Sequence, residues 1–141
     1  MPRRLRSWTG VSSLTLLWCA ACGSPPPADP DKKATFAVNG KVLLDGQALP
    51  AVTVVLHPRD AAGDKALRSY GKTDASGSFT LSTYQAGDGA PAGHYTVTVH
   101  GDPDAAVAAA VPDRYARTGS SGLQVEVKQQ ANDLPPFQLR R

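Results

Sequence analysis

Apolar residues occupy every second position in most of the chain after residue 33, and this spacing restricts the fold more than any other feature. The clearest case is GHYTVTVHG, in which Tyr95, Val97 and Val99 alternate with histidine and threonine side chains. A period of two places alternate side chains on opposite faces of a β-strand, whereas an amphipathic helix needs a period of 3.6. Similar alternation appears in TFAVNGKVLLDG, AVTVVLHP, FTLST, GLQVEVK and PPFQLR, and more weakly in ALRSYGKT. The sequence therefore predicts about seven strands, each with one buried face.

Turn-forming residues separate these stretches. Asp45-Gly46 follows the first stretch, Asp74 to Gly77 precedes FTLST, and Asn132-Asp133 precedes the last stretch. Asp, Asn and Gly accept the backbone angles that tight turns require. Short strands separated by turns, without a long amphipathic helix, predict an all-β fold made of one antiparallel sandwich. The Ala-rich segment from Asp104 to Pro112 is expected to be a loop across one end of it.

The first 33 residues differ in composition from the rest. Arg3, Arg4 and Arg6 precede an uncharged, largely apolar stretch from Trp8 to Trp18, which is the layout of a secretory signal. This stretch is shorter than the roughly 20 apolar residues that span a bilayer. Residues 22–33 are rich in Pro, Asp and Lys, so we expect them to form a solvated, extended tether.

The two cysteines have a Cys-x-x-Cys spacing, but a redox pair or a zinc ribbon would need a folded scaffold, and the ribbon a second pair of ligands. The small residues Ala20 and Ala21 directly precede Cys22. This arrangement resembles the bacterial lipobox, although Cys19 stands where that motif usually has Leu. The resemblance implies that Cys22 is lipidated and becomes the first residue of the mature chain. An ordinary cleaved signal and an uncleaved anchor remain alternatives. Because Gly23 follows Cys22 in place of the retention residue Asp, the resemblance also implies the outer membrane of a two-membrane bacterium.

The net charge of +3 belongs to the predicted signal. Without Arg3, Arg4 and Arg6 the chain has 12 basic and 12 acidic residues. Nucleic-acid-binding proteins carry clustered Lys and Arg on one face, and the sequence has no such cluster. We therefore expect no nucleic-acid partner.

Three stretches together resemble a known family: VNGKVLLDGQALPAVTVVLHP, GKTDASGSFTLSTYQAGDGAPAGHYTVTV and VPDRYARTGSSGLQVEVKQQANDLPPFQL. They are similar to carboxypeptidase regulatory-like, or transthyretin-like, domains, in versions found in bacterial surface lipoproteins of the planctomycete type. The resemblance implies a single antiparallel seven-stranded Greek-key sandwich. It suggests a signal peptide at 1–21, a tether at 22–33 and the sandwich at 34–141. The matching residues are turn formers and core positions, so they do not indicate a ligand.

Some transthyretin-like proteins are hydroxyisourate hydrolases, which use a C-terminal Tyr-Arg-Gly-Ser motif. This chain ends in Leu139-Arg140-Arg141, so such an enzyme is the least favoured alternative. We expect a non-catalytic protein without a cofactor.

Histidines are the candidate metal ligands. His57 and His94 both fall on the outer parity of their strands, and the resemblance makes those strands antiparallel neighbours. The two imidazoles could then face one another as a weak metal pair, but solvent-exposed histidines without a metal are the favoured reading. His100 is six residues beyond His94, about 20 Å along the strand, and is not expected to join them.

Three segments are candidate contact loops: Arg59 to Ala66, Tyr84 to Ala92 and Gly101 to Gly119. Within them Tyr84, Asp88 and Tyr115 are the candidate contact residues, although Tyr115 could instead plug one end of the core. The sequence thus predicts a lipid-tethered, non-catalytic interaction or structural module of the cell envelope. Its partners would be the membrane, through Cys22, and an envelope protein or extracellular polymer. A periplasmic small-ligand or metal-binding module is the alternative.

Overall fold

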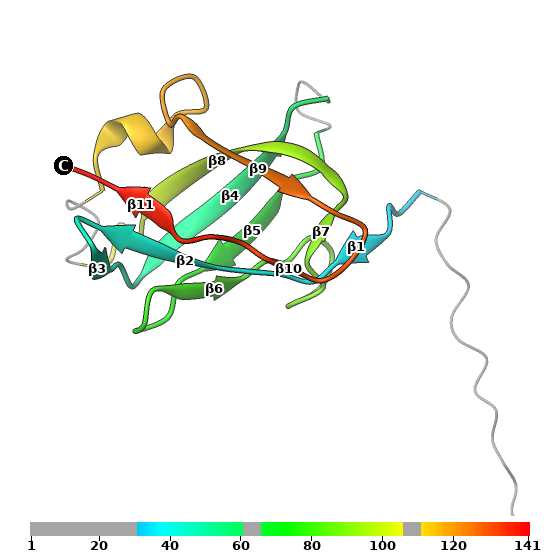
Figure 1. Ribbon diagram of the computed structural model, residues 1–141, viewed down its shortest axis with the longest axis horizontal. Coiled ribbons are helices and arrows are strands. Elements are labelled where there is room, and N and C mark those ends of the chain that lie inside the picture. The colour runs from blue at the N-terminus through cyan, green and yellow to red at the C-terminus, as the bar shows by residue number, and fades with distance from the viewer. Residues whose placement is uncertain (1–30, 61–65, 106–110) are drawn as a thin grey trace, which may run out of the picture.

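The computed structural model describes residues 31–60, 66–105 and 111–141. Within them the fold is all-β, as predicted, and the only helical element is the four-residue 3₁₀ helix η2 (Asp113–Ala116). The strands, labelled in Figure 1, are β1 (Thr35–Phe36), β2 (Val38–Leu44), β3 (Gln47–Ala48), β4 (Val52–Pro58), β5 (Ser69–Lys72), β6 (Ser78–Thr80), β7 (Ala90–Pro91), β8 (Gly93–Gly101), β9 (Leu123–Val127), β10 (Asn132–Asp133) and β11 (Phe137–Leu139).

Two larger sheets face each other across a shared core (Figure 1). One sheet has the strand order β5-β4-β8-β9 and is antiparallel throughout. The other is built around β2, which pairs antiparallel with β3 and β6 and parallel with β10 and β11. β1 and β7 form a small antiparallel sheet at one end.

The parallel pairing of β10 and β11 with β2 corrects the expectation of a fully antiparallel sandwich. After β9 the chain crosses to the other sheet and runs beside β2 in the same direction. Pro135 and Pro136 separate β10 from β11, because proline has no N–H to donate to the ladder. The described residues form eleven strands, several of them only two residues long, where the sequence predicted about seven.

The core consists of the residues that the alternation predicted. Val42 of β2, Val54 of β4 and Val97 of β8 are fully buried, and the rings of Phe79 and Phe137 stack with centroids 6.0 Å apart. Leu123 and Val125 are only partly buried because β9 is the edge strand of its sheet. One hydrophobic cluster therefore joins both sheets.

The predicted turn at Asp74 to Gly77 is confirmed in detail. Asp74 Oδ1 accepts hydrogen bonds from the backbone N–H groups of Ser76, at 2.8 Å, and Ser78, at 3.0 Å. Gly77 has a φ of +75° and packs so closely that a Cβ there would lie 2.7 Å from the carbonyl oxygen of Val42. The turn therefore needs both its acceptor side chain and its glycine.

The predicted signal peptide, Cys22 and most of the tether lie outside the described residues, as does part of the predicted Asp104 to Pro112 loop. Over the ranges that are described, no helix is long and apolar enough to cross a membrane.

Candidate functional site

The outward-facing side chains of the β5-β4-β8-β9 sheet form the surface that we call the outer sheet face. Strand alternation sets its membership, because Val54, Leu56 and Val97 point into the core and their neighbours therefore point out. It comprises Thr53, Val55, His57, Tyr70, Lys72, His94, Thr96, Thr98, His100, Gln124 and Glu126. Tyr70, beside Val55, is 57% exposed.

Thr98 lies between two imidazoles on this face. Its hydroxyl oxygen is 2.9 Å from Nε2 of His57 and 3.0 Å from Nε2 of His100. Thr98 is only 1% exposed, although its side chain points away from the core. A hydroxyl carries a single proton, so with both rings neutral it donates to one imidazole and accepts from the other. Burial, the positive charge of Arg68 and the neighbouring His100 together lower the pKa of His57.

The predicted pairing of His57 with His94 is wrong. His57 lies opposite Thr96 in the β4–β8 ladder, and its side chain bonds to Thr98, toward His100. His94 lies opposite Glu126 on β9. Strand parity placed these histidines on one face, but only the register and the side-chain rotamers decide which of them meet. In the part of the chain that the structure describes, no group of three or more His, Cys, Asp or Glu side chains could hold a metal ion.

Charged side chains of both signs lie on or beside the outer sheet face. Arg59 crosses toward β9, where its Nη1 donates to Oε1 of Gln124 at 3.1 Å. Lys72 forms an ion pair with Asp102 at 2.5 Å, and Glu126 is the other carboxylate of this surface. Arg68 precedes β5 at the parity of Tyr70 and is exposed. The outer sheet face thus combines cations, hydroxyls and one exposed aromatic ring.

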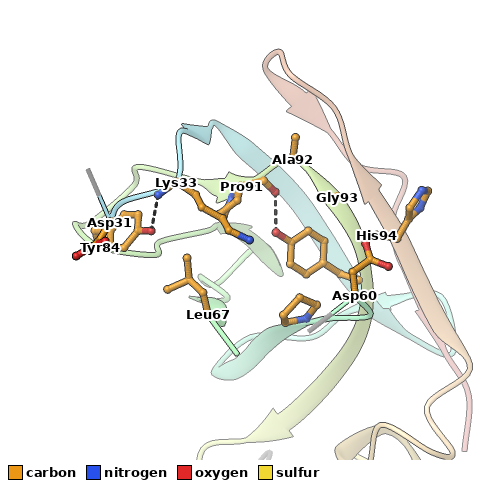
Figure 2. A pocket seen from close by; sticks show the side chains of 11 residues that line it. Asp31, Lys33, Asp60, Leu67, Tyr84, Pro91, Ala92, Gly93 and His94 are labelled. Atoms are coloured by element: carbon orange, nitrogen blue, oxygen red, sulfur yellow. Dashed lines mark hydrogen bonds between the residues drawn. The ribbon is translucent and has the colours of Figure 1, made fainter. Parts of the chain in front are cut away.

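A second candidate site is a cavity of about 380 Å³ near β1 and β7, which we call the tether-end pocket. Tyr95, Pro58 and Pro91 supply apolar surface, and the Tyr95 hydroxyl donates to the Pro91 carbonyl at 2.7 Å. Figure 2 shows Asp31 and Tyr84 on one side and Asp60 and His94 on the other, with Lys33 and Leu67 between them. Burial raises the pKa of Tyr95. The pocket is large enough for a small ligand.

Tyr84, a predicted contact residue, holds the segment that leads into the sandwich. Its hydroxyl accepts a hydrogen bond from the backbone N–H of Lys33 at 3.0 Å. The ammonium group of Lys32 lies 5.5 Å from the centre of its ring. Tyr84 therefore contacts the chain's own N-terminal lead.

Asp88, the second predicted contact residue, is used by its own loop. Its carboxylate accepts backbone hydrogen bonds from Thr83 at 2.6 Å, Tyr84 at 2.9 Å and Gln85 at 3.1 Å. Burial alone would raise its pKa, but these bonds stabilise the charged form and leave the pKa lowered. The structure thus gives Asp88 a structural role.

Tyr115, which the sequence offered as a contact residue or, preferably, as a plug for one end of the core, is buried in the core, in agreement with the second reading. It is 8% exposed, and its hydroxyl accepts a hydrogen bond from the backbone N–H of Arg140 at 3.1 Å. The guanidinium of Arg114 covers its ring at 4.8 Å.

The sequence did not predict that Thr98, His100 and Arg68 lie close together. The alternation in GHYTVTVHG does place Thr98 and His100 on one face, two residues apart. Arg68 comes from a distant stretch, and only the pairing of β4 with β5 brings it to His57.

Comparison with protein-family models finds no match to this chain, and comparison with curated protein sequences finds none either.

Proposed function

We propose that this protein is a lipid-tethered, non-catalytic binding module on the extracytoplasmic face of a bacterial membrane, and that it presents its outer sheet face to a partner in the envelope. The proposal includes a transthyretin-like sandwich of the carboxypeptidase regulatory type, outer-membrane location and lipid on Cys22.

The outer sheet face is the observation that carries the binding role. Tyr70 is 57% exposed and has Arg68 and three histidines on the same face. Tyr and Arg are enriched where proteins contact partners, since they offer contact area and directed hydrogen bonds. The β4 and β8 strands beneath it are the inner strands of the sheet and pair with each other over the whole length of β4, which supports the face.

The N-terminal lead supports the tethered arrangement. The backbone of Lys33 is bonded to Tyr84, and the chain then enters β1, which pairs with β7. The stretch between Cys22 and Asp31 would reach roughly 30 Å if it were polyproline-like. A domain held at that distance would stand clear of the lipid surface.

The anchor is tested by intact mass spectrometry on the membrane fraction of cells that express the full chain. We expect a mature chain that starts at Cys22 and carries acyl chains, and a Cys22→Ala variant that lacks them. A soluble, unlipidated product cut at another position would contradict the anchor.

The binding face is tested by placing a photo-crosslinking amino acid at position 70 in cells. The matched control places it at Gln138, an exposed position of β11 in the opposite sheet. We expect adducts from position 70 that position 138 does not give. Equal adducts from both positions, or none from position 70, would argue against the outer sheet face.

A small-ligand module is the second candidate, and the tether-end pocket favours it. Its volume of about 380 Å³ and the ring of Tyr95 suit a small molecule with an apolar part. Leu67→Trp, which would fill this pocket, should abolish ligand binding without changing crosslinking from position 70.

A further inference from the structure

The Thr98 hydroxyl forms a hydrogen-bonded bridge between His57 and His100. These two titratable rings lie where positive charge is already present. Both rings reach the same hydroxyl oxygen, from strands β4 and β8, at 2.9 and 3.0 Å. Arg68 lies near His57, and its charge lowers the pKa of that imidazole. Protonation of both rings would therefore gather three cations in one small area.

When both imidazoles of the bridge are protonated, the hydrogen bonds to Thr98 no longer satisfy every donor. An anion outside the bridge would then be needed to stabilise the charged rings. Once both Nε2 atoms carry protons, the Thr98 hydroxyl can accept from the rings but can donate to neither. Thr98 is 1% exposed, so water is not at hand to accept its proton. An imidazolium that turns outward removes this conflict, and an anion on the surface would stabilise it there.

We propose that His57, His100 and Arg68 bind carboxylate groups of an acidic polysaccharide that lies along β4 and β8, and that binding tightens as the pH falls. This inference rests on the proposed function, because it names the partner of the same face.

We call the basic side chains of this face the basic track: Arg59, His94, His57, Arg68, His100 and Lys72. The shape of the basic track favours a thin polymer. Arg59 and His94 lie toward one end of it, while His100 and Lys72 lie toward the other. His94 and His100 are six residues apart on β8, which is about 20 Å along a strand. A thin polymer that runs along the strand can reach both ends of this length.

The surrounding groups favour a sugar chain over a peptide. Extended peptides usually bind by adding to a sheet edge, whereas β4 and β8 are the inner strands of this sheet. The side chains of Thr53, Thr96 and Gln124 can exchange hydrogen bonds with sugar hydroxyls. Tyr70 adds a ring on which a sugar can pack.

Carboxylates also lie on or beside this surface and limit its charge, among them Asp60, which lies near His94. Asp102 is paired with Lys72, and Glu126 lies opposite His94, at the edge strand β9. The side chains of His57 and His100 bond to Thr98. The gain of charge when these two rings are protonated therefore falls around Thr98.

The test measures binding of the full chain, purified in detergent, to polygalacturonate, with neutral dextran as the control polymer. Binding should be at least about tenfold tighter near pH 5 than near pH 8, since imidazoles titrate between these values. The His57→Gln/His100→Gln double variant should lose this pH ratio. Arg68→Gln should weaken binding at both pH values, whereas Lys41→Gln, which removes a charge from the opposite sheet, should change neither the affinity nor the pH ratio.

A second measurement does not depend on the variants folding. In NMR titrations of the unmodified chain, polygalacturonate should raise the pKa values of His57 and His100 more than that of His94, because the bound anion stabilises the imidazolium forms. Unchanged histidine pKa values would overturn the proposal, as would equal binding to dextran or an unchanged pH ratio in a folded double variant.

Other polyanions separate this inference from the proposed function. Tighter binding to polyglutamate or duplex DNA than to polygalacturonate would overturn the polysaccharide but leave a binding face. Crosslinks from position 70 to a protein would likewise overturn the polysaccharide and leave a binding face. A different result would contradict both the proposed binding face and this inference. In that result position 70 gives no crosslinks, and polygalacturonate binds strongly at the tether-end pocket.

Discussion

Single side chains in this protein decide local stability through their hydrogen bonds and their backbone angles. The bridged His57 is one example. Its pKa is lowered from 6.5 by burial, by Arg68 and by His100, so the folded state favours the neutral ring. A lowered pKa means that the unfolded chain binds the proton first as the pH falls.

This linkage predicts that the free energy of unfolding decreases as the pH falls from about 6.5 through the folded-state pKa of His57. Urea unfolding over that range should show the decrease in the unmodified chain and much less of it in His57→Gln. His94→Gln, which replaces an imidazole outside the bridge, should keep it. A decrease of the same size in His57→Gln would contradict the assignment.

Position 89 accommodates only glycine. Its φ is +87°, and a Cβ would lie 1.8 Å from the carbonyl oxygen of Phe36. Gly89→Ala should lower the free energy of unfolding by about 3 kcal/mol or more, from backbone strain and from the clash. Gly119→Ala has nothing within 4 Å of the new Cβ and is the matched control for thermal unfolding. A Gly89→Ala protein as stable as this control would show that β1 does not pack against Gly89.

Strands and turns were predicted correctly where the residues that determine them are close together in the sequence. The alternation in GHYTVTVHG predicted β8, and the structure places the strand at Gly93–Gly101. The turn at Asp74 was predictable because its acceptor and its donors are close in sequence. The parallel pairing of β11 with β2 was not, because a strand's own residues do not specify its neighbour. The His57–Thr98–His100 bridge was missed for the same reason, since it depends on the register of β4 against β8.

The corner between β7 and β8 is fixed by the hydroxyl of Tyr95, which donates to the Pro91 carbonyl at 2.7 Å in a buried position. Tyr95→Phe should cost about 1 to 2 kcal/mol, because the carbonyl loses its partner away from water. Tyr70→Phe, at an exposed position, should change stability little. Chemical denaturation compares the two, and equal midpoints would contradict the role of the Tyr95 bond.

At the scale of the whole molecule, β11 closes the sheet around β2 and completes the core. Phe137 is 7% exposed and Leu139 is fully buried, whereas Arg141 is exposed and pairs with Asp45 at 3.3 Å. Loss of two buried side chains of this size costs about 5 kcal/mol or more, and a domain has about 5 to 15 kcal/mol in all. The C-terminal strand should therefore be essential.

Deletion of residues 137–141 should leave the chain largely unfolded by circular dichroism. Deletion of Arg141 alone should have a small effect, because an exposed ion pair contributes about 1 kcal/mol or less. A folded chain without residues 137–141 would show that β2 does not need β11.

The pairing of β2 with β11 also determines when folding can finish. Leu44 of β2 and Leu139 of β11 are direct neighbours, so nearly the whole domain must be present before this contact forms. Contacts between residues so distant in sequence slow folding. A growing chain would hold β2 without this partner until β11 had been synthesised, and the domain could not complete its core before then.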